Sequence, residues 1–337
     1  MAPSWQLLVF GLAVAAGLIS GGSRKVLLFQ IVVFALVATL NRENADFDNY
    51  KLTYEAIDRN TSVYSVYFEL YEPGYRFLAR AADAGRYSFE VFRAGLICMS
   101  LFIIFYAIRD LPYCSRAFSG YLLFPGLLEV VQLRNLVAGA LVTLSYSLAF
   151  KSNREGKDSY RAVVAALGAT SFQAVAWVYA ITVVGVTAAR RSLLLNLAGA
   201  VFLAVGFESF VSQLSVPVLI ARFSEYAGTQ TSILTRVGSE VVLLLSVVLL
   251  LRASEGVQWP WSARYLFIIP IAICALLVPF NVEFLRIFRN LVLVLGSLLF
   301  SSTPRGWLMF FVAIVPLAYL FNIVAGFDLV TKPILSL

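Results

Sequence analysis

The sequence contains no histidine in its 337 residues. This absence excludes histidine-dependent catalytic triads, HExxH zinc sites and histidine-ligated haem. Cysteine is also scarce, and the three cysteines stand far apart, so the sequence has neither a CxxC motif nor a disulfide framework. Motifs of the GxGxxG, Walker A and GxSxG types are missing as well. We therefore expect neither a metal ion nor a cofactor.

Charged residues are few, at 13% of the chain, whereas soluble domains carry roughly 25%. Hydrophobic residues make up 60%, in runs long enough for helices that cross a bilayer. The net charge of +7 does not indicate a nucleic-acid partner. Outside residues 41–93 there are 19 basic and 10 acidic residues, and the basic ones lie in short loops, as in the cytoplasmic loops of membrane proteins. The sequence predicts an all-α integral membrane protein.

The apolar runs predict a single transmembrane domain over residues 1–337 with about 11–12 passes. The first run lacks the basic segment of a signal peptide, so we expect it to be retained as a span. Two runs are long for one span and short for two. They are 117–150, interrupted at Pro125-Gly126, and 162–189, with its tip at 168–173. Each is predicted to be a broken or re-entrant hairpin of two shortened helices.

The segment 41–92 interrupts this apolar pattern. With Arg93 it holds 16 of the 45 charged residues and seven of the 16 tyrosines. We expect an extracytoplasmic loop with an interfacial helix from Pro73, because proline suits a first helical turn and apolar residues recur after it at helical spacing. A second extracytoplasmic segment is expected at 208–236.

Two kinds of residue in these segments suggest chemistry. Glu72, at the start of the interfacial helix, and Asp48 are carboxylates placed to act as a base; a helix cap for Glu72 and a solvated turn for Asp48 are the structural alternatives. Nearby side chains are candidates for substrate binding, with an interfacial aromatic belt as the alternative for the tyrosines. These candidates are Arg42, Asp46, Tyr50, Tyr71 and Tyr75.

Arg134 lies inside an apolar run, where an arginine is costly unless it is paired or hydrated. Its planar guanidinium suits bidentate contact with phosphate oxygens, so we predict a catalytic role; an ion pair with Glu129 or Glu208 is the alternative. Weaker candidates for substrate binding share a polar side chain near an expected membrane surface or hairpin tip, and snorkelling is the alternative for the arginines. They are Gln132, Gln173, Arg222, Arg286 and Arg289.

The order of these motifs resembles a known family. DFDNY at 46–50, EPGY at 72–75, QLRNLVA at 132–138, a lysine-rich loop and PFNVEFLRIFRN at 279–290 are similar to the EpsG family of bacterial polysaccharide polymerases, which is related to Wzy-type O-antigen and capsule polymerases. The family commonly has a histidine in the hairpin after the lysine-rich loop, where this chain has Thr170 to Gln173. Because a glutamine is no base, the departure favours a carboxylate in that role.

The resemblance implies a metal-independent glycosyltransferase that joins repeat units carried on undecaprenyl diphosphate, at the outer face of a bacterial inner membrane. The expected partners are the lipid-linked donor and acceptor glycans, the bilayer and other polysaccharide-assembly proteins. Three alternatives stay open: a transporter or flippase for a lipid-linked sugar, an O-antigen ligase, and a non-catalytic subunit of an export machine.

Overall fold

The computed structural model is helical throughout the residues that it describes, which confirms the all-α prediction. These residues are 5–40, 46–57, 63–155, 159–188, 241, 261–277 and 285–297. Several predicted features lie outside them: the second extracytoplasmic segment at 208–236, and the candidates Arg42 and Arg222. The apolar runs at 193–207 and 307–324 and all but residue 241 of the run at 237–251, which count among the predicted passes, lie outside them too.

The chain begins with a helical hairpin of α1 (Trp5–Ser20) and α2 (Arg24–Leu40), and α7 (Cys114–Tyr121) packs against both helices. α1 has the bounds that its apolar run predicts. At the crossing, the buried Gln30 side chain donates to Ser119 Oγ at 2.8 Å and to the Ala13 carbonyl at 3.0 Å. Gly17 permits this close approach, since a methyl group there would lie within 2.2 Å of Ser119 Oγ.

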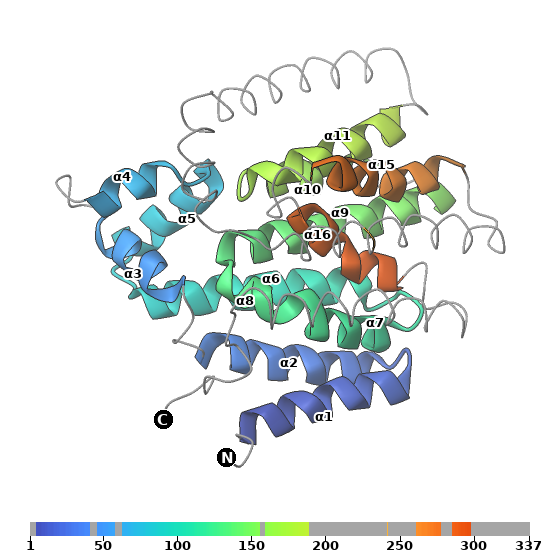
Figure 1. Ribbon diagram of the computed structural model, residues 1–337, viewed down its shortest axis with the longest axis horizontal. Coiled ribbons are helices and arrows are strands. Elements are labelled where there is room, and N and C mark those ends of the chain that lie inside the picture. Colours follow the sequence, from blue (N-terminus) through green and yellow to red (C-terminus); the bar gives the residue numbers. More distant parts are fainter. Residues whose placement is uncertain are drawn as a thin grey trace.

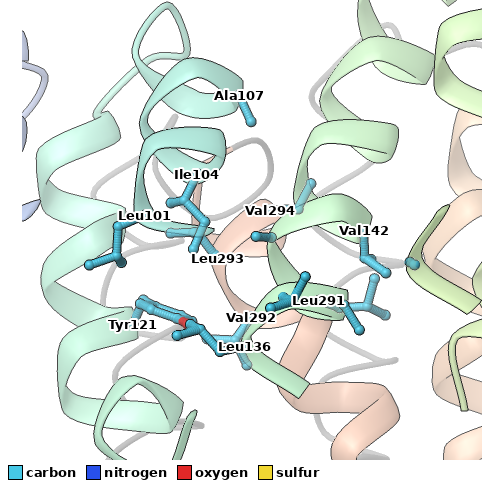
Figure 2. Close-up of a cluster of buried hydrophobic side chains, with 14 of the residues drawn as sticks. Leu101, Ile104, Ala107, Tyr121, Leu136, Val142, Leu291, Val292, Leu293 and Val294 are labelled. Atoms are coloured by element: carbon cyan, nitrogen blue, oxygen red, sulfur yellow. The ribbon is translucent and has the colours of Figure 1, made fainter. Parts of the chain in front are cut away.

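The centre of the molecule is α9 (Leu133–Glu155), which packs against α6 (Phe89–Ile108), α10 (Ser159–Thr170) and α16 (Leu285–Leu295). α11 (Trp177–Ala188) packs against both α10 and α15 (Trp261–Leu277) (Figure 1). Figure 2 shows the core where α6, α7, α9 and α16 meet. Its labelled side chains are Leu101, Ile104, Ala107, Tyr121, Leu136, Val142, Leu291, Val292, Leu293 and Val294.

The two predicted hairpins have different structures. In the first, α7 is followed by a π-helical turn at Leu122–Gly126, by α8 (Leu127–Val131) and, after a break at Gln132, by α9. The first arm is irregular at Pro125, but α9 has 23 residues, so the prediction of a shortened second helix is wrong. The second hairpin is confirmed: α10 and α11, of 12 residues each, are joined by the turn at 171–173 and a 3₁₀ turn at Ala174–Ala176.

Two of the described helices are long and apolar enough to cross a membrane: residues 89–108 of α6 and 133–150 of α9. α1, α11 and α15 contain shorter apolar stretches. The described residues therefore carry two clear candidate spans out of the larger number that the sequence predicts.

The polar segment forms a small layer of three helices: α3 (Phe47–Glu55), α4 (Val63–Glu69) and α5 (Pro73–Ala84). Figure 1 shows this layer at the end of the bundle where α6 begins. The buried Arg93 of α6 joins the layer to the bundle, because its guanidinium donates to the Ala38 carbonyl near the end of α2 at 2.8 Å and lies 5.2 Å from the ring centre of Phe47. The predicted helix from Pro73 is confirmed, with proline in its first turn.

Candidate functional site

Arg134 stands in the first turn of α9, directly after the break that separates α8 from α9. The break is at Gln132, whose φ of −102° and ψ of 71° are not helical. Because the side chain projects from the end of a helix, it reaches the polar layer and remains only 18% exposed. An apolar run thus places a permanent cation at the boundary between the bundle and the α3–α5 layer.

Glu72 is the ion-pair partner of Arg134. Its side chain is 11% exposed, and Oε2 accepts a hydrogen bond from Arg134 Nη1. Glu72 occupies the N-cap position of α5 with extended backbone, yet its carboxylate makes no capping bond to that helix. Oε1 accepts instead from the Ala174 backbone N–H at 3.3 Å. The carboxylate therefore bonds to α9 and to the turn before α11, and it is not the helix cap that the sequence suggested as an alternative.

Gly74 brings Glu72 into place. Its backbone N–H donates to the Ser171 carbonyl at 2.8 Å, which docks the start of α5 on the turn between α10 and α11. A methyl group on Gly74 would lie 2.7 Å from that carbonyl oxygen. The Glu-Pro-Gly sequence thus supplies a carboxylate, a proline for the first helical turn and a residue small enough for the close approach.

Three aromatic residues, here called the tyrosine cluster, surround Arg134: Tyr50 of α3, Tyr71 before α5 and Tyr75 within α5. Their ring centres lie 5.3–5.8 Å from one another. Arg134 Nε donates to the Tyr50 hydroxyl at 3.3 Å, and the guanidinium lies 4.3 Å from the centre of the Tyr71 ring. A desolvated cation–π contact of this kind stabilises by about 2 kcal/mol. The cluster thus contacts the guanidinium through one hydroxyl group and one ring face.

Burial affects the phenols of the tyrosine cluster. It raises the pKa of Tyr71, and it raises the pKa of Tyr75 well above the ordinary value, because a phenolate would be poorly solvated there. Both residues are therefore neutral near pH 7. The Tyr75 hydroxyl is buried and has no hydrogen-bond partner among the residues that the structure describes, whereas its ring also contacts Phe92.

Gln173 connects the ion pair to α16. With its amide oriented to suit its neighbours, the nitrogen donates to Glu72 Oε1 at 3.3 Å and the oxygen accepts from Arg286 Nη1 at 3.2 Å. Glu72 thus receives hydrogen bonds on both oxygens, from Arg134 on one and from the turn at 173–174 on the other. The Gln173 side chain thus bridges Glu72 and a second guanidinium, that of Arg286.

A second ion pair lies deeper in the bundle, between Arg289 of α16 and Glu129 of α8, which are 4% and 2% exposed. Arg289 Nε and Nη2 donate to Glu129 Oε1 at 3.1 and 2.8 Å, and Nη1 donates to Gln132 Oε1 at 3.1 Å. Glu129 Oε2 accepts from Asn135 at 2.6 Å. The alternative partner suggested by the sequence for Arg134, Glu129, is therefore engaged by Arg289.

The structure brings together many of the residues proposed from the sequence. The connected polar group contains Glu72, Arg134, Tyr50, Tyr71, Tyr75, Gln173 and Arg286, whereas Gln132 and Arg289 belong to the second ion pair. Asp46 lies close enough to Tyr71 to help raise the pKa of that phenol. Asp48, by contrast, is exposed on α3, and no described contact joins it to Arg134 or Glu72.

One motif and two backbone contacts were missed in the sequence analysis. Asp46 and Asp48 form an Asp-x-Asp sequence, but the described residues contain no group of three His, Cys, Asp or Glu side chains able to hold a metal. The docking of Gly74 on Ser171 and the Ala174 hydrogen bond to Glu72 involve backbone groups about 100 residues away. The only sequence signal for this contact was the glycine directly after Pro73.

Comparison with known proteins identifies one family. The family model of the EpsG family matches residues 24–332, which is nearly the whole chain. No curated protein and no solved structure matches. The matched range includes every residue of the connected polar group.

Proposed function

The chain belongs to the EpsG family, a family of the polysaccharide-polymerase type, and from this premise we propose that it is a polytopic membrane glycosyltransferase. It joins oligosaccharide repeat units carried on undecaprenyl diphosphate at the outer face of the bacterial inner membrane. The observation that carries this proposal is the Glu72–Arg134 pair, a base and a phosphate-binding cation held together at one end of the bundle.

The donor supplies a diphosphate as leaving group. In the resting structure, Arg134 and Glu72 satisfy each other's charge. The diphosphate takes the place of Glu72 on the Arg134 guanidinium, whose fork suits two phosphate oxygens. Arg286, connected to Glu72 through Gln173, adds a second positive charge. These cations stabilise the charge that develops as the bond between the anomeric carbon and the diphosphate breaks.

The displaced carboxylate becomes the base. The acceptor hydroxyl attacks the anomeric carbon, its proton passes to Glu72, and the lipid diphosphate departs with the bonding electrons. Gln173 and the Ala174 N–H hold Oε1, so Oε2, which Arg134 has released, faces the acceptor. Of the two carboxylates considered, Glu72 suits this role because Asp48 lies exposed and apart.

The α3–α5 layer is the sugar-binding region in this proposal. Tyr71, half-buried beside Arg134, offers the ring available for stacking, whereas Tyr50 and Tyr75 are buried behind it. Asp46 lies near Tyr71 and supplies a hydrogen-bond acceptor for sugar hydroxyls. The layer lies at the end of the bundle, which supports a reaction at the membrane surface.

The test is polymer formation by purified protein in lipid, with lipid-linked repeat units as substrate. Glu72→Gln and Arg134→Lys should each reduce the rate of glycosidic-bond formation by about 100-fold. The matched controls are Glu69→Gln and Arg80→Lys, which change an exposed ion pair in the same layer and should retain the rate within about twofold. Wild-type rates for both site variants would contradict the proposed mechanism.

The same assay separates the alternatives. A flippase or a non-catalytic subunit would form no new glycosidic bond from lipid-linked substrates alone. A ligase would transfer glycan once to a different acceptor, so the product would not lengthen with time. A ladder of products that differ by one repeat unit is the result expected of a polymerase.

A further inference from the structure

The residues that contact the second ion pair lie on both sides of the helix break that precedes Arg134. Glu129 precedes the break, Gln132 forms it and Asn135 follows it. Arg289 of α16 contacts the first two of these residues directly, and Glu129 links it to the third. Arg134 lies in sequence between Gln132 and Asn135, so it stands on backbone that is fixed on both sides.

The Arg289 side chain is unsuited to binding substrate in this structure. All three guanidinium nitrogens donate to Glu129 or Gln132, and the side chain is 4% exposed. A buried pair of this kind is costly to break, because loss of one partner leaves the other charge buried and uncompensated. The arginine thus differs from Arg134, whose partner Glu72 belongs to a different layer and is more exposed.

We infer that Arg289, acting through Gln132 and the Glu129–Asn135 contact, is a positioning residue that sets the direction of Arg134. The inference rests on the proposed function, in which Arg134 binds the donor diphosphate. Gln132 is the only non-helical residue between α8 and α9, so the angle between these helices depends on it. A misplacement of about 1 Å at a reacting group is enough to cost about 100-fold in rate, so a modest rotation at Gln132 matters.

The test uses Gln132→Leu, which removes the acceptor for Arg289 Nη1 and leaves the Arg289–Glu129 pair intact. We expect kcat per folded molecule to fall about tenfold. The matched control is Gln30→Leu, which removes buried hydrogen bonds to Ala13 and Ser119 at the crossing of α1, α2 and α7 and none to Arg289, Glu129 or Arg134. This control should lower thermal stability and leave kcat within about twofold.

Coupling to Arg134 distinguishes positioning from general stability. In an Arg134→Lys background, Gln132→Leu should reduce kcat by less than about twofold, because the guanidinium that it positions is already gone. Arg289→Lys provides a second variant. It keeps a positive charge beside Glu129, but a single nitrogen replaces the three nitrogens of the guanidinium. We therefore expect kcat to fall while the unfolding temperature stays near that of the wild type.

The outcomes separate this inference from the proposed function. The positioning role is wrong if the reductions in kcat caused by Gln132→Leu and Arg134→Lys multiply in the double variant. It is also wrong if Gln132→Leu has the same kcat as its Gln30→Leu control. In either case the proposed function stands. If Arg134→Lys itself has wild-type kcat, both ideas are overturned. A tenfold effect of Gln132→Leu alone that disappears in the Arg134→Lys background supports the inference.

Discussion

At the scale of single residues, the site is an arrangement of groups that satisfy one another across large separations in sequence. Glu72 and Arg134 are 62 residues apart, and Arg289 and Glu129 are 160 apart. Arg134 was recognisable from sequence because a permanent charge in an apolar run demands a partner. The identity of the partner was not, because nothing local to the α8–α9 region indicates which carboxylate the fold brings near.

Tyr75 provides a prediction about stability. Its hydroxyl is buried, and no described residue accepts or donates a hydrogen bond to it, so Tyr75→Phe should raise the free energy of unfolding by about 1–3 kcal/mol. The matched control is Tyr146→Phe, which removes a buried hydroxyl that donates to the Leu266 carbonyl at 2.8 Å and should be destabilising. Thermal unfolding in detergent measures both. Destabilisation of Tyr75→Phe to the extent of the control would show that the hydroxyl is paired.

Gly74 provides a prediction about activity. In Gly74→Ala the new methyl group meets the Ser171 backbone carbonyl, which cannot rotate away, so the start of α5 must move and carry Glu72 with it. Polymerisation should fall at least tenfold, given the sensitivity of proton transfer to distance. Gly95→Ala is the control: nothing lies within 4 Å of the added methyl group, and alanine favours the α6 helix by about 0.5–1 kcal/mol. Equal activity of the two variants would count against the docking role.

At the scale of elements, the sequence predicted best where local chemistry decides the structure. The start of α5 follows from Pro73, and α1 follows from an uninterrupted apolar run. The sequence predicts the end of this helix at residue 150, where the apolar run stops and the lysine-rich loop begins, but α9 extends to Glu155. Lysine, arginine and glutamate are good helix formers, so a basic cluster that ends a span need not end the helix.

The α1–α2–α7 contact provides a prediction at this scale. Gly17→Ala would place a methyl group within 2.6 Å of the Ser115 carbonyl and closer still to Gln30 and Ser119, so overpacking should cost about 1–3 kcal/mol. Gly11→Ala, on the same helix with open space around it, should be neutral or stabilising. A thermal-unfolding comparison decides the matter, and similar stability of the two variants would argue against close packing at Gly17.

At the scale of the whole molecule, several helix ends converge on the α3–α5 layer. α6 and α9 begin there, and the turn between α10 and α11 docks on α5. No local sequence pattern predicts that these helix ends meet, because their positions result from the packing of helices around α9. Part of the site could therefore be predicted residue by residue, whereas its assembly required the fold.

The proposed orientation can be tested by labelling. The test starts from a variant in which Cys98, Cys114 and Cys274 are replaced by serine. In cells that have lost the outer membrane or cell wall but keep an intact inner membrane, Asp48→Cys in the α3–α5 layer should react with a membrane-impermeant thiol reagent. Asp110→Cys, just beyond the other end of the 20-residue α6, should react only after the membrane is opened. The reverse pattern would place the layer in the cytoplasm.

The mutual neutralisation of Glu72 and Arg134 has a kinetic consequence. While the guanidinium holds the carboxylate, a sugar hydroxyl that arrives alone finds no free base, and neither does water. Turnover should then require the donor to bind before the acceptor, as in a compulsory-order mechanism. Initial-rate measurements with both substrates varied would reveal this order of binding, in which the diphosphate of the donor releases Glu72 to act as the base.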